Sequence, residues 1–114
     1  MATPTAMHAL RERFDPTVSA WPGAVRKTLF GHPGYAVHGK VFAFFNDGEA
    51  VVKAPTGERE ALLTHEGAYV WTPPGSGMSR FGNWIGLSEL SFSDDELSDA
   101  LAAAYEALAT MASG

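Results

Sequence analysis

The sequence of 114 residues contains no cysteine. This absence excludes a disulfide framework and every thiolate metal site, and it favours a reducing, cytoplasmic location. Long apolar runs are also missing: the longest, Val41–Phe45 and Ala100–Tyr105, fall well below the roughly 18 residues that a membrane-spanning helix needs. The N-terminus has no unbroken apolar stretch of the kind found in signal peptides. We therefore expect a cytoplasmic protein with no membrane partner.

Charge of one sign is missing from two parts of the chain. Residues 16–46 contain no acidic residue, and residues 81–114 contain six acidic residues but no lysine or arginine. The formal net charge of −5 therefore arises near the C-terminal end. Most of these acids lie in or next to the first turn of a predicted helix, where the helix dipole favours negative charge. We interpret them as stabilising a helix terminus rather than as an acidic binding surface.

The large side chains that are present indicate one domain spanning residues 1–114. A chain of this size buries about 65% of the surface that its unfolded form exposes. Seven Phe, three Trp and three Tyr residues are enough to fill a core without disulfides or structural metals.

The residue pattern predicts helices at both ends and in the middle of the chain. Residues 5–21 form one kinked helix or two short ones, because Asp15-Pro16 is a second helix-start signal. Thr56 is the expected N-cap of a helix over Gly57–His65. Ser93-Asp94-Asp95-Glu96 is a capping box that starts the last helix.

Between the helices the pattern predicts extended segments separated by turns. The turn signals are Gly31–Gly34, Gly39-Lys40 and Asn46–Gly48, the last typical of a tight hairpin. The predicted strands are Ala24–Phe30, Tyr35–His38, Val41–Phe45, Ala50–Ala54, Ala68–Thr72 and Phe81–Leu87. This order favours a two-layer α+β fold, with helices on one face of an antiparallel sheet.

Two nucleotide-related motifs are matched only in part. Gly34–Lys40 fits G-x-x-x-x-G-K, but Val41 stands where a phosphate-binding loop needs Ser or Thr, so we interpret the segment as a hairpin turn. Lys40–Phe44 partly matches an RNA-recognition strand, on which Phe42 and Phe44 would share one face and stack on bases. The glycine that should follow the lysine is missing, so core packing is favoured for both rings.

No spacing in the sequence is typical of an active site or a metal site. The histidines are dispersed, without a pair at helical spacing, and they are His8, His32, His38 and His65. Ser76 lacks the nucleophile-elbow context of the G-x-S-x-G hydrolases. We therefore expect a non-enzymatic protein without a metal or cofactor.

The acid-free window carries the main candidate for a binding surface. Basic side chains in and near it would contact nucleic-acid phosphates if they lay on one surface; these candidates are Arg26, Lys27, Lys40, Lys53 and Arg80. The alternative is a set of scattered residues that face solvent. The net charge opposes strong non-specific binding, yet it does not exclude a local patch, because exposed charges are screened beyond about 8–10 Å.

A second candidate surface lies around the loop between Trp71 and Trp84, which contains Arg80. Partly exposed aromatic side chains near an arginine are common at protein interfaces. Core packing is nevertheless the favoured interpretation for both tryptophans. A protein-interaction adaptor would use this Trp71/Arg80 loop or the face of the sheet.

Several short segments serve as markers of a resemblance to a known family. These markers are His32-Pro33, Gly39-Lys40 before Phe42-Ala43, Lys53-Ala54-Pro55 and Trp84-Ile85. With these markers, residues 24–110 resemble the MmcQ/YjbR family and the related N-terminal domain of the competence regulator TfoX. The resemblance implies a two-layer α-β(3)-α-β(2)-α fold, similar to secretion chaperones, and it supplies no catalytic residue. Members are often described as DNA-binding by analogy of fold. The sequence thus predicts weak DNA binding or, as the alternative, a protein-interaction adaptor.

Overall fold

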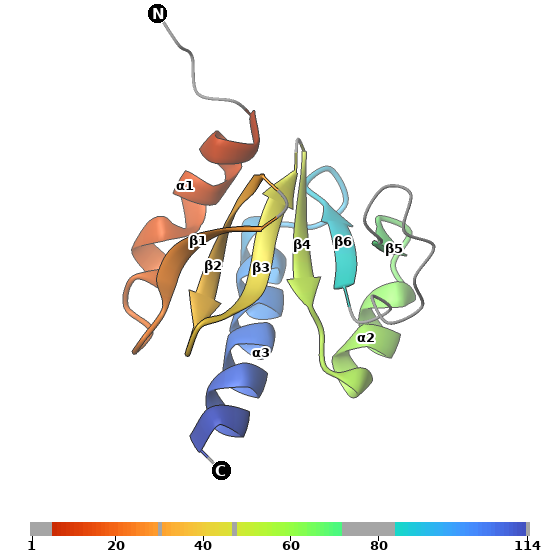
Figure 1. The fold of residues 1–114 in the computed structure, drawn as a ribbon. Coiled ribbons are helices and arrows are strands. Elements are labelled where there is room, and N and C mark those ends of the chain that lie inside the picture. Colours follow the sequence, from red (N-terminus) through yellow and green to blue (C-terminus); the bar gives the residue numbers. More distant parts are fainter. Residues whose placement is uncertain (1–5, 30, 47, 72–83, 114) are drawn as a thin grey trace, which may run out of the picture.

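The computed structural model describes residues 6–29, 31–46, 48–71 and 84–113. Within these ranges the elements follow the order shown in Figure 1: α1 (Ala6–Val18), β1 (Val25–Leu29), β2 (His32–Val37), β3 (Lys40–Asn46), β4 (Glu49–Lys53), α2 (Thr56–Leu63), β5 (Ala68–Val70), β6 (Trp84–Ser88) and α3 (Asp94–Ser113). The strands form one antiparallel sheet with the order β1-β2-β3-β4-β6-β5.

The helices pack against one face of this sheet, which confirms the predicted α+β class (Figure 1). In the part of the chain that the structure describes, four strands precede α2. This is one more than the resemblance implies, because residues 25–29 pair with β2 as the edge strand β1. The predicted strands at Ala68–Thr72 and Phe81–Leu87 correspond to β5 and β6, and the ends of these predictions at residues 72 and 81–83 lie outside the described residues.

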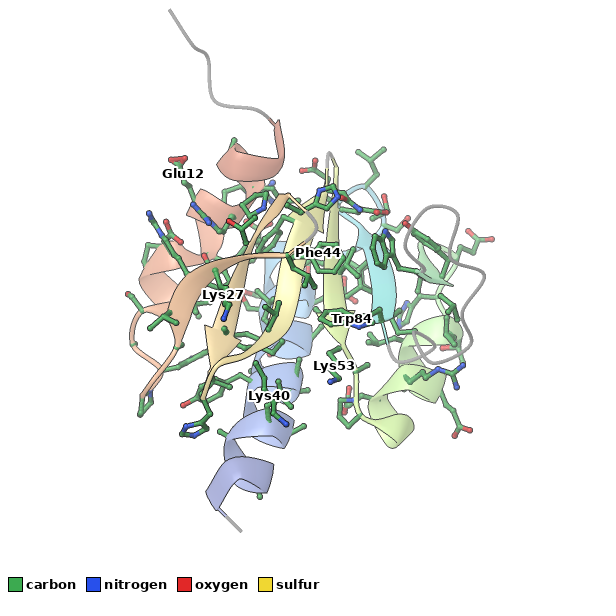
Figure 2. The ribbon with its side chains drawn as sticks, viewed as in Figure 1. Glu12, Lys27, Lys40, Phe44, Lys53 and Trp84 are labelled. Carbon is green, nitrogen blue, oxygen red and sulfur yellow. The ribbon has the colours of Figure 1, made fainter. Side chains whose placement is uncertain are left out.

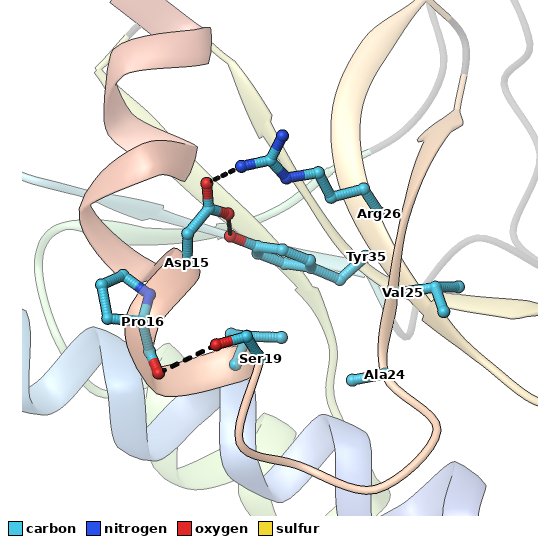
Figure 3. A pocket seen from close by; sticks show the side chains of 8 residues that line it. Asp15, Pro16, Ser19, Ala24, Val25, Arg26 and Tyr35 are labelled. Atoms are coloured by element: carbon cyan, nitrogen blue, oxygen red, sulfur yellow. Dashed lines mark hydrogen bonds and ion pairs between the residues drawn. The ribbon is translucent and has the colours of Figure 1, made fainter.

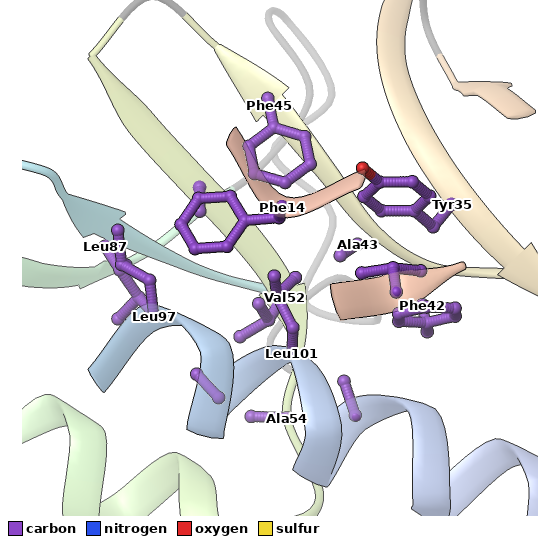
Figure 4. Close-up of a cluster of buried hydrophobic side chains, with 14 of the residues drawn as sticks. Phe14, Tyr35, Phe42, Ala43, Phe45, Val52, Ala54, Leu87, Leu97 and Leu101 are labelled. Atoms are coloured by element: carbon purple, nitrogen blue, oxygen red, sulfur yellow. The ribbon is translucent and has the colours of Figure 1, made fainter. Parts of the chain in front are cut away.

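The main core lies between the sheet and the helices (Figure 4). Phe14 of α1 stacks on Phe45 of β3 with 6.0 Å between ring centroids, and Tyr35 of β2 meets Phe45 edge-on at 5.8 Å. Leu97 and Leu101 of α3 are fully buried against the same face. Burial of each such side chain contributes about 1.5–3 kcal/mol, so this layer supplies the main stabilisation of the fold.

The positions of the hairpins follow from residues that accept a positive φ. His38 (φ 52°) and Gly39 (φ 78°) join β2 to β3, and Gly48 (φ 79°) lies between β3 and β4. The interpretation of Gly34–Lys40 as part of a hairpin is therefore confirmed. The predicted turn at Gly31–Gly34 is wrong in part, because His32, Pro33 and Gly34 belong to β2.

A bulge in β3 separates two aromatic residues that the sequence analysis placed on one face. Tyr35 pairs with Ala43 and the next β2 residue, Ala36, pairs with Val41, so Phe42 has no partner in β2. The extra residue turns Phe42 towards the helices and leaves Phe44 on the opposite face. The expectation of a shared face was wrong, and since both rings are fully buried, core packing is confirmed.

The helix starts agree with the sequence only in part. In the capping box, the Ser93 N–H donates to Glu96 Oε1 at 2.8 Å and the Glu96 N–H donates to Ser93 Oγ at 3.1 Å, as predicted. The hydrogen bond that the Ser93 backbone N–H donates to the Glu96 carboxylate holds the pKa of Glu96 below its usual value. The expected cap at Thr56 is wrong, because Thr56 is the first helical residue and Pro55 is the N-cap. Asp15 lies inside a single helix α1, so the two-helix alternative is also wrong.

Gly34→Ala should destabilise the fold through backbone contact between β2 and β3. A Cβ at this position would lie 2.4 Å from the Ala43 carbonyl oxygen and 2.9 Å from Phe44 Cβ, and overpacking of this kind costs about 1–3 kcal/mol. Gly57→Ala in α2 is the matched control: its Cβ meets nothing within 4 Å, and alanine favours a helix by about 0.5–1 kcal/mol. Urea unfolding measures both changes. Equal midpoints for Gly34→Ala and the wild type would contradict the close approach.

Candidate functional site

The face of the sheet that carries no helix holds a second, smaller aromatic cluster. Phe44 lies 4.8 Å from Trp71 and 5.3 Å from Trp84 between ring centroids, and His32 stacks on Phe44 at 5.6 Å. Trp71 and Trp84 are only 7% and 8% exposed, which confirms core packing for both tryptophans. Trp71 therefore presents little exposed aromatic surface, and the remainder of the Trp71/Arg80 loop, with Arg80 itself, lies outside the described residues.

Lys27 and Lys53 lie on this same helix-free face (Figure 2). Lys27 is opposite Gly34, Gly34 is opposite Phe44, and Phe44 is opposite Val51, so all four positions share one face. Lys53 follows Val51 by two residues and faces the same way. Since three strand spacings separate β1 from β4, the two lysines are about 15 Å apart. Each charge therefore acts largely alone at ordinary ionic strength.

The helix-free face is not uniformly basic. Glu49 of β4 lies two residues before Val51, and its carboxylate accepts the Tyr69 hydroxyl at 2.6 Å and the Asn46 side-chain amide at 2.7 Å. Burial and then the bond to Glu49 raise the pKa of Tyr69. This acid lies on the β4 strand that carries Lys53, so it reduces the positive potential on that side of the face.

Arg26 and Lys40 do not join this pair. Arg26 is opposite Tyr35, whose ring packs towards α1. The Arg26 guanidinium forms an ion pair with Asp15. Lys40 is opposite Val37, a residue of the helix-side core, at the far end of the β2–β3 hairpin. Of the predicted basic residues that the structure describes, Lys27 and Lys53 thus share the helix-free face, whereas Arg26 and Lys40 lie on the helix side at different places.

Asp15 organises the helix-side edge near β1 (Figure 3). Its two carboxylate oxygens accept bonds from the Tyr35 hydroxyl and the Arg26 guanidinium. The Tyr35 hydroxyl also lies 2.9 Å from the Arg11 carbonyl oxygen. Burial, followed by the bond to Asp15 and its charge, raises the pKa of Tyr35 well above its usual value. This network ties α1 to both strands of the first hairpin.

A cleft of about 360 Å³ opens beside this network, between α1 and the start of β1. Its lining is mostly apolar with a few polar groups; the residues are Asp15, Pro16, Val18, Ser19, Ala24, Val25, Arg26 and Tyr35. The volume is at the lower end of the range for ligand sites. Figure 3 shows Ala24 and Arg26 directed towards the cleft and Val25 directed away from it.

The strand that borders this cleft is an open edge of the sheet. β1 pairs with β2, and no other strand among the described residues lies beside it. Its first four residues are exposed, with Val25 56% exposed. Because successive backbone groups of a strand point to alternate sides, half of the N–H and C=O groups of β1 face away from β2. Such an edge can accept another strand.

Sequence reasoning missed this site because it assigned its central residue another role. Asp15 before Pro16 has the form of a helix start, and no spacing rule connects it with Arg26 or Tyr35. The signal that was available is the isolation of its charge: Asp15 immediately precedes the acid-free residues 16–46. Asp15 is therefore the acidic residue nearest in the sequence to Arg26, the first basic residue of this window.

Two further searches of the described residues gave no site. No group of three or more His, Asp or Glu side chains in these ranges is placed to hold a metal ion. No helix among the described residues combines the length and apolar character needed to cross a membrane.

Within the described ranges, the fold and this edge define a small α+β domain with a helix layer on one face of a six-stranded antiparallel sheet. The family model described as YjbR matches residues 19–107, well over half of the chain. The chain therefore belongs to the YjbR family. The curated proteins contain no match to it, and neither do the solved structures.

Tyr35→Phe should lower the free energy of unfolding by about 1–2 kcal/mol at neutral pH, because a buried bond to a carboxylate is lost. The raised pKa of Tyr35 also predicts an alkaline effect. The unfolded tyrosine ionises near pH 10 while the folded one keeps its proton, so this contribution is present below about pH 10 and is lost as the pH rises further. Urea unfolding between about pH 9 and pH 11 tests this. The decline should be shallower in the variant, and equal slopes would contradict the buried hydroxyl.

Proposed function

We propose that this YjbR-family chain is a non-enzymatic, cytoplasmic protein-interaction domain that binds an extended segment of a partner along the free edge of β1. One observation carries the proposal: β1 is an edge strand of five residues with its first four exposed. An added strand would bind the outward backbone groups, and main-chain hydrogen bonds of this kind provide affinity in strand addition.

The composition of β1 supports a partner other than a second copy. In an antiparallel pair of two β1 strands centred on Lys27, the two Lys27 side chains would lie directly opposite each other, which is destabilising. A lysine on an edge strand commonly prevents self-pairing in this way. Pairing of β1 with the β1 strand of a second copy is therefore disfavoured, while the outward backbone groups of β1 remain accessible.

Selection from a randomised peptide library displayed on phage should yield extended sequences that bind the full chain. Binding should slow hydrogen exchange at alternate amides of residues 25–29, because those that face solvent in the free protein become bonded in the complex. Amide exchange measured by NMR with a selected peptide checks this. Absence of enrichment over an empty matrix, or protection confined to other elements, would contradict strand addition at β1.

Weak DNA binding is a second candidate, and one observation favours it: Lys27 and Lys53 share the helix-free face (Figure 2). Contact of both lysines with phosphates would release about two counterions. Affinity for a labelled duplex should then fall about tenfold between about 50 and 200 mM salt.

Lys27→Glu and Lys53→Glu should each reduce the slope of log K against log salt by about one. Fluorescence anisotropy measures these slopes. Equal slopes in wild type and both variants, or no salt-sensitive binding at about 50 μM protein, in the weak range of non-specific binding, would contradict contact through this face.

A further inference from the structure

The residues around the start of β1 present different chemistry on the two faces of the sheet edge. Ala24 and Arg26 point towards the cleft on the helix side, whereas Val25 points away from it (Figure 3). Lys27 lies on the helix-free face, two residues after Val25. A strand added to this edge would place its successive side chains next to these two faces in turn.

Two basic side chains stand next to each other on the edge and face opposite ways. Arg26 uses one guanidinium nitrogen for Asp15, and its side chain is still 60% exposed. Since a guanidinium carries five N–H donors, Arg26 can bind a second carboxylate without releasing Asp15. Lys27 is exposed on the other face. Two consecutive acidic residues in the added strand would therefore meet Arg26 on one face and Lys27 on the other.

The two residues before this basic pair are apolar. Val25 is 56% exposed. Ala24 lies over the cleft, where Pro16 and Val18 supply further apolar surface. The cleft of about 360 Å³ has room for an aliphatic side chain that points to the helix side. Apolar side chains opposite Ala24 and Val25 would thus remove apolar surface from water on both faces.

We infer that the partner segment is an extended strand in which two consecutive acidic residues directly adjoin two consecutive apolar residues. The acids lie beside Arg26 and Lys27, and the apolar residues lie beside Ala24 and Val25. This inference rests on the proposed strand addition and specifies the chemistry of the segment that binds. Recognition by charge and shape at alternate side chains supplies specificity, while the backbone bonds supply affinity.

The chain itself does not offer such a segment. Its only consecutive acids are Asp94-Asp95-Glu96, and these residues form the first turn of α3. They are held there by the reciprocal bonds between Ser93 and Glu96. A second copy would have to unwind the start of its last helix to occupy the β1 edge, so charge complementarity points to a different protein.

Fluorescence anisotropy of labelled peptides binding to the full chain tests the inference. Each peptide contains two Glu next to two Val, and both orders, Glu-Glu-Val-Val and Val-Val-Glu-Glu, are needed because either strand direction is possible. The better of the two should bind about tenfold more tightly than its counterpart with Lys in place of Glu, since two cross-strand charge pairs are exchanged for two repulsions. Lys27→Glu should weaken the Glu peptide and strengthen a peptide in which the Glu beside Lys27 is replaced by Lys. Lys53→Glu is the matched control on the same face and should leave both affinities unchanged.

The cleft is tested separately with Ser19→Trp, which places a large ring at its rim. This variant should weaken a peptide with Val opposite Ala24 several-fold and leave the corresponding Ala peptide unchanged. Far-ultraviolet circular dichroism of each variant confirms that the fold is kept.

Each outcome separates the inference from the proposed function. Peptides that protect the amides of β1 but bind equally well with Glu and with Lys would overturn the inferred chemistry and leave strand addition standing. Failure of every library and designed peptide to protect those amides would overturn both. Sedimentation of the chain alone as a dimer with protected β1 amides would show that a second copy occupies the edge, and it would overturn the inferred partner.

Discussion

The close contact of β2 with β3 fixes the arrangement of the whole sheet. At Gly34 the two backbones approach so closely that a Cβ would touch the Ala43 carbonyl oxygen. Directly beyond this point, the bulge at Phe42 shifts the register by one residue. Because side chains alternate between faces, that single residue decides which aromatic rings enter the helix-side core and which lie on the other face. Phe45 and Phe42 join α1 and α3, whereas Phe44 anchors the smaller cluster with the tryptophans.

Asp15 has a comparable role for the charges. One carboxylate joins α1 to Tyr35 and to Arg26, so the arginine is oriented towards the helix layer and away from Lys27. The Asp15 carboxylate also offsets part of the positive potential around Arg26, whose side chain remains 60% exposed. This arrangement explains why a window of 31 residues without an acid, residues 16–46, does not produce a continuous basic surface. It produces an edge strand with one cation on each face.

An open edge that carries lysine is stable in isolation and selective in binding. The same side chain that opposes pairing with a second copy attracts a carboxylate. The helix-side cleft would add shape complementarity to this binding, because residues of α1 and of the start of β1 line it together. Backbone groups, charges and apolar surface therefore meet within residues 24–27, over a distance that a short extended peptide can span.

Short-range patterns in the sequence predicted the class of fold and part of the local structure, although the cap at Thr56 and part of the turn at Gly31–Gly34 were wrong. The reciprocal cap at Ser93 and Glu96, the hairpins at Gly39 and Gly48, and the layer order all depend on neighbours in the chain, so spacing was sufficient to predict them. Tertiary structure alone decided the face of each side chain. The bulge at Phe42 cancelled the alternation on which the shared face of Phe42 and Phe44 was predicted. The link between Asp15 and Tyr35 joins residues that have no periodic relation. Register and cross-element contacts result from packing of the whole core, and a local pattern does not contain that information.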